Sequence, residues 1–261
     1  MTPPGHPVVL AAVAHPDDIE FLFAGTLLLL KNAGCQIHMW NLCDGACGTM
    51  IHSREEIIRI RAAEAARSAE ISGATLHPSA FPDVGIFYDK PSLATVAAVI
   101  RSVQPQIILT HSLQDYMEDH QNVSRLVTMG AFCRAMRNYP TAPERAPYAD
   151  PVRIYHAPPH GLKDGIGNLF QPDRLVDIGS VIETKTRMLA CHESQGAWLE
   201  GSQAMAGFTG EMQAMCRRIA AWGSGLEYAE AWRMHSHLGF CPEDFDPLAK
   251  CLGVHQKPLA T

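Results

Sequence analysis

The sequence lacks the features that mark a secreted, membrane or nucleic-acid-binding protein. Its 261 residues carry a formal net charge of −6, so there is no basic excess of the kind that binds nucleic acid. The first residues, Met1 to Pro7, contain no Lys or Arg, and the longest apolar stretch, Phe21–Leu30, is too short to span a bilayer. These absences predict a cytoplasmic protein that binds neither nucleic acid nor membrane.

Two further absences concern covalent links and cofactors. The 8 cysteines show no paired zinc-ribbon spacing, and a chain of this length needs no disulfide framework, so we expect reduced thiols. No Gly-x-Gly-x-x-Gly follows the first apolar run, which argues against a dinucleotide site at that turn. The residues found there instead are His15-Pro16-Asp17-Asp18.

Apolar runs and amphipathic segments alternate along the chain. The expected strands are Val8–Ala14, Ile37–Leu42, Thr75–Phe81, Ile107–His111, Val152–His156 and Leu175–Ile178. The expected helices are Gly25–Asn32, Ser53–Ser72 (opened by a capping box of Ser53 and Glu56), Ser92–Val103, His120–Arg137, Val181–Leu199 and Met205–Ala221. This alternation predicts an α/β fold, a Rossmann-like three-layer sandwich with a mostly parallel central sheet and C-terminal helices.

The domain organisation follows from the same pattern. Asn138–Pro151 is rich in proline and is the best candidate for a linker or surface loop. The strand expected at Val152–His156 suits the edge of the same sheet. We therefore predict a single domain over residues 1–261, with a core at residues 8–137 and an extension at residues 150–261 packed on it.

Two clusters of histidine and carboxylates follow expected strands. The first is His15-Pro16-Asp17-Asp18, and the second is Asp115-Tyr116-Met117-Glu118-Asp119-His120. Because ligands and catalytic groups collect at the carboxyl ends of parallel strands, we expect the two clusters to meet.

His15, Asp18 and one further histidine would supply the three ligands of a catalytic zinc site. Asp17, beside the metal but not bound to it, is then the natural proton acceptor for a metal-activated water.

Ala14-His15-Pro16-Asp17-Asp18 after a Val-rich strand resembles the signature of the PIG-L (LmbE-like) family of zinc-dependent N-deacetylases. Asp119-His120 is similar to the family's second motif. Two supporting stretches also resemble the family, Arg61-x-x-Glu64 and Leu189–Gln195. The resemblance extends over most of residues 8–200.

The resemblance implies a role for seven residues. Metal ligands would be His15, Asp18 and His120, with Asp17 as the general base and Asp119 orienting a neighbouring group. Arg61 and Asp83 would contact substrate, although a surface salt bridge on its own helix is an equal alternative for Arg61. The implied cofactor is Zn²⁺, although Fe²⁺, Co²⁺ or Mn²⁺ suits the same ligands. The implied substrate is a small N-acylated, amino-sugar-like molecule, and the family often forms homo-oligomers.

The sequence departs from the family at Met117. Many members have a histidine there, which stabilises the oxyanion or protonates the leaving amine, and methionine can do neither. Tyr116, His111, His156 or His160 could substitute, or Asp17 could serve as both base and acid. The alternative functions are a thiol-conjugate amidase and a catalytically weakened metal-binding scaffold. We also expect Trp198, Trp222 and Trp232 in the core, although a sugar-stacking platform is an alternative.

Overall fold

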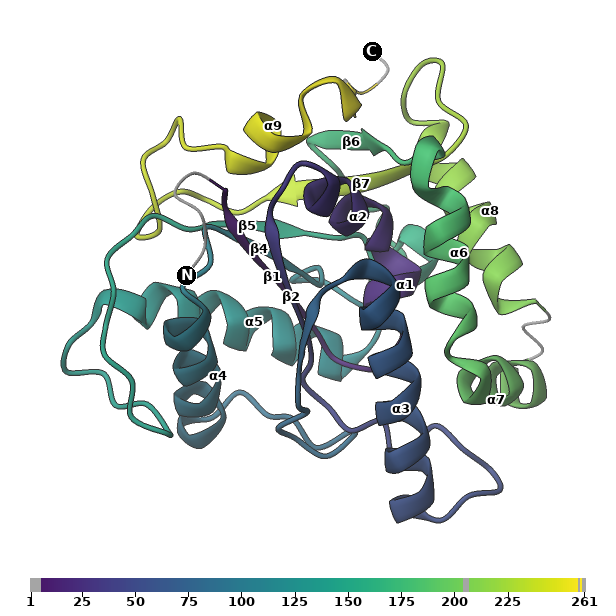
Figure 1. The fold of residues 1–261 in the computed structure, drawn as a ribbon, viewed down its shortest axis with the longest axis horizontal. Helices are drawn as coiled ribbons and strands as arrows, with labels where there is room; N and C mark the ends of the chain where they lie inside the picture. Colours follow the sequence, from purple (N-terminus) through teal and green to yellow (C-terminus); the bar gives the residue numbers. More distant parts are fainter. Residues whose placement is uncertain (1–5, 204–206, 258, 260–261) are drawn as a thin grey trace.

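The computed structural model describes residues 6–203, 207–257 and 259. Its strands are β1 (Val8–Val13), β2 (Gln36–Asn41), β3 (Thr75–His77), β4 (Ile107–Thr110), β5 (Arg153–His156), β6 (Arg174–Asp177), β7 (Ala229–Met234) and β8 (Gln256–Lys257). They form one sheet of order β3-β2-β1-β4-β5-β7-β6-β8 (Figure 1). The first five strands in this order pair in parallel, and β7, β6 and β8 pair antiparallel. The predicted α/β fold with a mostly parallel sheet is confirmed.

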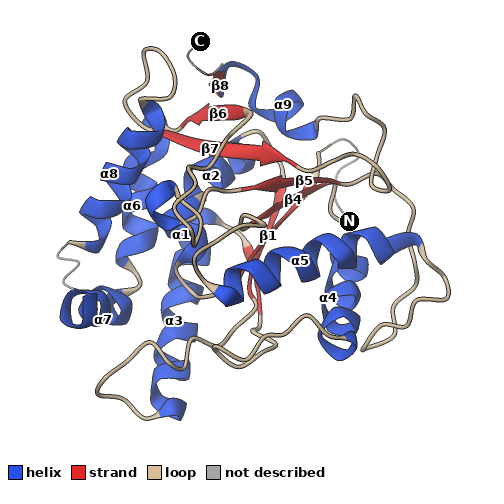
Figure 2. Cartoon of the chain, turned by 180° about the vertical axis from the view of Figure 1, so that it is seen from behind, coloured by secondary structure: helices blue, strands red, loops and turns tan. Residues whose placement is uncertain are grey.

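Helices cover both faces of this sheet (Figure 2). They are α1 (Asp18–Leu22), α2 (Ala24–Asn32), α3 (Arg54–Ser72), α4 (Lys90–Val103), α5 (Glu118–Phe132), α6 (Ile182–Ala190), α7 (Glu193–Gln203), α8 (Phe208–Ala220) and α9 (Pro247–Leu252). α4 and α5 lie on one face, whereas α1, α2, α6 and α8 lie on the other. No helix within the described ranges is both long enough and apolar enough to cross a membrane.

The sequence of β1 explains why this strand is central. Val9, Ala11 and Val13 pack into the core on the α2 and α6 face, whereas Leu10 and Ala12 pack into the core beneath α4 and α5. A strand that is apolar on both faces suits the middle of a parallel sheet. Its neighbours β2 and β4 lead the chain in opposite directions, so a topological switch point lies at its carboxyl end, where ligands bind in open α/β sheets.

A buried ionic network joins α2 to β7. The carboxylate of Glu230 accepts hydrogen bonds from the backbone N–H groups of Gly25 and Thr26 at 2.9 and 2.7 Å, and Lys185 Nζ donates to it at 2.5 Å. A Cβ at Gly25 would lie only 2.8 Å from this carboxylate, so the close approach requires glycine.

Several element predictions were wrong in detail. The helix expected at Val181–Leu199 is two helices, α6 and α7, interrupted at Cys191 and His192. The strand expected at Thr75–Phe81 ends at His77, and Phe81 makes only an isolated bridge. Neither α1 nor β7 was predicted. The capping box of Ser53 and Glu56 is confirmed.

The described part of the last long helix begins at Phe208, and the expected beginning at Met205 lies outside the described residues. Strands from residues 153–257 belong to the same sheet as those of residues 8–110. The division into a core and an extension of one domain stays a prediction.

Candidate functional site

The turn after β1 carries three of the predicted site residues. β1 ends at Val13 and α1 begins at Asp18, so His15 and Asp17 lie at the carboxyl end of the sheet. The backbone N–H of His15 donates to Oδ2 of Asp18 at 2.7 Å, which closes the turn. Asp17 holds φ at 117°, a left-handed conformation that costs a non-glycine residue about 1–3 kcal/mol. Such strain is typical of functional turns.

The first turn of α5 brings the second cluster to the same place. Nε2 of His120 lies 3.5 Å from Oδ1 of Asp18, and its Nδ1 lies 3.2 Å from Oδ1 of Asp115. Ligand atoms of His15, Asp18 and His120 all lie within 4.8 Å of one another. The structure therefore brings the three predicted ligands together.

Carboxylates surround the imidazole of His15. Its Nδ1 lies 3.4 Å from Asp18 Oδ2, whereas its Nε2 lies 3.1 Å from Asp83 Oδ1 and 3.2 Å from Asp119 Oδ2. Burial disfavours the charged imidazole, but hydrogen bonds to Asp119, Asp18 and Asp83 raise the pKa of His15 well above its ordinary value. One ring nitrogen thus faces Asp18 while carboxylates hold the other, as they do for metal-binding histidines.

The donor set fits a divalent cation. Within the described residues no hydrogen-bond partner reaches Nε2 of His120, which is buried and directed towards Asp18. Two imidazole nitrogens and one carboxylate oxygen are a ligand set of catalytic zinc sites. Asp83, Asp115 and Asp119 add negative charge around the ligands that a bound cation would balance.

Asp17 is held beside this cluster by Arg61 of α3. Arg61 is 3% exposed, so the alternative of a surface salt bridge is wrong. Its guanidinium donates to the carbonyl oxygens of Pro16 and Gly45 at 2.5 and 3.0 Å, and NH2 lies 3.6 Å from Asp17 Oδ1. Burial raises the pKa of Asp17 to about 6, although the charge of Arg61 opposes the shift. A carboxylate with a pKa in this range suits proton transfer near neutral pH.

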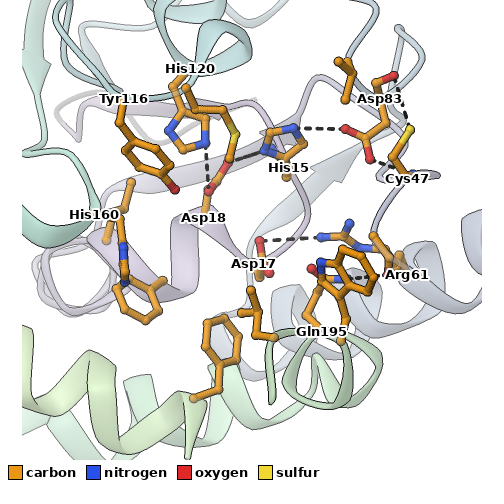
Figure 3. Close-up of a pocket in the computed structure, with 18 residues that line it drawn as sticks. His15, Asp17, Asp18, Cys47, Arg61, Asp83, Tyr116, His120, His160 and Gln195 are labelled. Atoms are coloured by element: carbon orange, nitrogen blue, oxygen red, sulfur yellow. Dashed lines mark hydrogen bonds and ion pairs between the residues drawn. The ribbon is translucent and has the colours of Figure 1, made fainter. Parts of the chain in front are cut away.

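A cavity of about 320 Å³ opens over the cluster (Figure 3). Its polar lining comprises His15, Asp17, Asp18, Cys47, Gly48, Arg61, Asp83, Tyr116, His120, His160 and Gln195. Its apolar lining comprises Phe21, Leu22, Val84, Met117, Trp198, Leu199 and Phe208. All predicted site residues except Asp119 line it, and Asp119 contacts it through His15. The expectation that Trp198 lies in the core was wrong, whereas Trp232 is fully buried.

The wall of this cavity also contains Met117, at the position where the family often has histidine. Of the four candidate substitutes, Tyr116 and His160 line the same cavity. His111 is fully buried, and His156 lines a separate cavity. Tyr116 and His160, which lie on one side of Asp18 in Figure 3, are thus the two candidates that face the cavity, whereas Nε2 of His111 lies 3.3 Å from Asp18 Oδ2.

The two supporting stretches of the resemblance contact each other. Glu64 accepts hydrogen bonds from the N–H and Oγ of Ser194, at 2.8 and 2.6 Å, and so caps the first turn of α7. The next residue, Gln195, donates from Nε2 to the carbonyl of Gly48 at 3.1 Å. These contacts tie α7 to α3 and to the loop that contacts Arg61.

The sequence did not reveal three of the groups that shape the site. Asp115 was noted only as part of a cluster, although it contacts His120. Gln195 and Phe208 enter the cavity from helices that are distant in sequence, and no local signal marks Phe208. Only the quoted stretch Leu189–Gln195 could have pointed to Gln195.

Comparison with known proteins agrees with this architecture. The family model PIG-L (GlcNAc-PI de-N-acetylase) matches residues 10–130, which span β1 to α5 and both clusters. Over 191 residues the chain is 29% identical to the diacetylchitobiose deacetylase of Thermococcus kodakarensis, covering 72% of this chain and 69% of that protein. Over 194 residues it is 28% identical to the 4-oxalmesaconate hydratase of Pseudomonas putida, covering 71% and 73%.

Solved structures share the fold across most of the chain. The N,N'-diacetylchitobiose deacetylase of Pyrococcus horikoshii matches with a TM-score of 0.74 at 20% identity, over 91% of this chain and 88% of that one. The 4-carboxy-2-hydroxymuconate hydratase of Pseudomonas putida matches with a TM-score of 0.69 at 24% identity, over 92% and 98%. The family match makes residues 10–130 of this chain a PIG-L family domain, and the solved structures show that the fold extends over most of the chain.

Proposed function

We propose that this chain is a metal-dependent hydrolase that removes an N-acyl group, in particular acetyl, from a small amino-sugar-like molecule. One observation carries the proposal. His15, Asp18 and His120 converge in a cavity whose wall also holds a carboxylate, Asp17, placed beside the ligands and paired with Arg61. The family and the deacetylase among the relatives support the same chemistry.

The three ligands would hold the metal through Nδ1 of His15, a carboxylate oxygen of Asp18 and Nε2 of His120. Asp83 and Asp119 fix the ring of His15 from behind. We propose zinc, because two imidazoles and a carboxylate suit it, while Fe²⁺, Co²⁺ and Mn²⁺ accept the same set. A divalent cation bound there supplies a Lewis acid that polarises the acyl carbonyl and acidifies water.

Asp17 moves the proton in this proposal. Its carboxylate accepts a proton from the attacking water and returns it to the nitrogen of the departing amine. Arg61 keeps that carboxylate ionised and fixes the turn that presents it, so Arg61 is a positioning residue. Tyr116 and His160 are the donors that we propose for the developing charge on the acyl oxygen.

A hydratase is the second candidate, because one relative has that activity by name. The name of its substrate describes a carboxylate anion. Among the described residues that line the cavity, Arg61 is the only Lys or Arg, and its guanidinium already contacts Pro16, Gly45 and Asp17. The carboxylates around it favour an uncharged amide over such an anion.

The test measures metal content and amine release for the wild type, His15→Ala and Asp17→Asn. The substrates are N-acetylated sugars, simple amides and thiol-conjugate amides, with an unsaturated polycarboxylate assayed for hydration. We expect about one metal per chain, lost in His15→Ala and kept in Asp17→Asn, whose amine release is abolished.

Each of the other outcomes contradicts the proposal. Metal binding without release of any amine would support the scaffold alternative, and hydration of the polycarboxylate would support the hydratase. Absence of metal from the reconstituted wild type would refute the metal site itself.

A further inference from the structure

The cavity over the ligand cluster has an apolar wall as well as a polar one. Six apolar side chains form the wall: Phe21, Leu22, Met117, Trp198, Leu199 and Phe208. Arg61, Asp83 and Gln195 line the polar side of the same cavity. Phe21, Leu22 and Phe208 also pack in the hydrophobic core, and the parts of the six side chains that line the cavity are the surface that a bound molecule would meet.

This wall is a fixed part of the fold. Phe21 and Leu22 belong to α1 and are only 5% and 4% exposed. The ring of Phe208, at the beginning of α8, stacks on that of Phe21 with centroids 5.4 Å apart and an interplanar angle of 24°. The centroid of the Phe21 ring also lies 4.9 Å from that of the His160 imidazole. A preformed surface of this kind binds apolar groups without first having to be ordered.

The chemistry of the wall selects one kind of substituent. None of the six side chains is charged, and only the indole of Trp198 contains an N–H donor. A hydroxyl-rich group against this surface would lose hydrogen bonds to water and regain few. An aromatic ring or an alkyl chain would instead be removed from water and would gain binding free energy.

The wall begins only three residues after the ligand-bearing turn. Asp18 is the first residue of α1, and Phe21 and Leu22 lie in the same short helix. A group that contacts them is therefore close to the amide that the metal site and Asp17 would hold. Met117, the residue before α5, also lines the cavity.

We infer that the substrate carries an aromatic or short alkyl group next to its acylated nitrogen, and that this group binds against the apolar wall. The inference rests on the proposed function, whose substrate class it narrows. A cavity of about 320 Å³ is at the small end of ligand sites, which span about 300–1,000 Å³, so one ring-sized substituent is the size that fits.

The test compares matched pairs of substrates that differ only in this group. The pairs are the methyl and phenyl β-glycosides of N-acetylglucosamine, and N-acetylethylamine with N-acetylphenethylamine. The metal-loaded wild type should hydrolyse the phenyl member of a pair with a kcat/KM at least about tenfold higher. Equal values within both pairs would overturn the inference.

Variants of the wall test whether it is the source of the preference for phenyl substrates. Phe208→Ala should reduce the tenfold preference to about threefold or less, because the phenyl glycoside loses more binding free energy than the methyl glycoside does. Leu199→Asn provides a second variant in case Phe208→Ala does not fold. Phe87→Ala is the matched control, because Phe87 is 61% exposed and does not line the cavity. A preference that persists in both cavity variants would refute the assignment of the wall.

A binding measurement separates this inference from the proposed function. Calorimetric titration of metal-loaded Asp17→Asn with the two glycosides measures affinity without turnover. The phenyl glycoside should bind at least about tenfold more tightly than the methyl glycoside, even if no amide is ever hydrolysed. If amides are hydrolysed but the two affinities are equal, the apolar wall is refuted and the hydrolase stands.

Discussion

Replacing Arg61 by methionine tests the link between the turn after β1 and its chemistry. Arg61→Met keeps an unbranched apolar stem but removes the guanidinium, and with it the donors to the carbonyls of Pro16 and Gly45, which lie at 2.5 and 3.0 Å. Hydrogen bonds from a charged donor contribute about 1.5–3 kcal/mol each, so two of them predict a loss of about 3–6 kcal/mol in unfolding free energy. The loss is measured by urea denaturation.

The same change alters the pH dependence of the reaction. Asp17 must be ionised to accept a proton, and the cation 3.6 Å away favours its ionised form. Removing that charge raises the pKa of Asp17 from about 6, so the acidic limb of kcat/KM moves to higher pH. We expect a shift of about one unit or more, and therefore a larger loss of rate at pH 6 than at pH 9.

Arg61→Lys is the matched control. Lysine keeps the positive charge but lacks the fork that reaches two carbonyls and a carboxylate at once. This variant should lose stability while its acidic limb stays near that of the wild type. An acidic limb that is unchanged in Arg61→Met would refute the role of the guanidinium in holding Asp17 ionised.

Three further perturbations address the metal site and the core. Asp115→Asn removes the carboxylate that lies 3.2 Å from Nδ1 of His120, so it should weaken metal binding about 10–100-fold. Competition with a chelator measures this affinity, and an unchanged affinity would contradict the prediction. Glu230→Ala leaves Lys185 buried without its carboxylate partner, so it should lower the free energy of unfolding in urea by about 3–5 kcal/mol while the metal content stays unchanged. A variant as stable as the wild type would show that the network is not needed. Removal of metal by a chelator should abolish amine release and added zinc should restore it, whereas activity in the metal-free protein would exclude the proposed mechanism.

The sequence predicted those parts of the fold that short-range patterns determine. β1 is apolar at every position, and Ser53 with Glu56 marks the beginning of α3 directly. β7 was missed because Glu230 interrupts its apolar pattern. That glutamate is buried only because Lys185 and the beginning of α2 meet it there, and such partners cannot be read from a local window.

The candidate site likewise contains residues that the sequence predicts and residues whose role it leaves open. His15, Asp17 and Asp18 lie within one turn, so their spacing alone predicts a common site. Arg61 was ambiguous on a helix whose charged residues mostly face solvent, and only its contacts with Pro16 and Gly45 show which way it points. Contacts of this kind depend on packing between segments that are distant in the sequence.

The part of the chain that matches the family and the part that shapes the cavity are different. The three ligand residues and Asp17 all lie within residues 10–130, where the family model matches. Gln195, Trp198 and Phe208 lie beyond that range, on α7 and α8, yet they line the cavity above the ligands. Because Glu64 accepts two hydrogen bonds from Ser194, α7 is held against the part of the chain that matches the family model.

Relatives that match this chain differ in their named activities. A deacetylase and a hydratase both match this chain at similar identity, so the shared part cannot by itself specify the reaction or the substrate. The choice must depend on the residues that α7 and α8 add to the walls of the cavity. Substitutions in those walls should therefore change which amide is bound while leaving metal content unchanged, whereas substitution of a ligand residue should remove both.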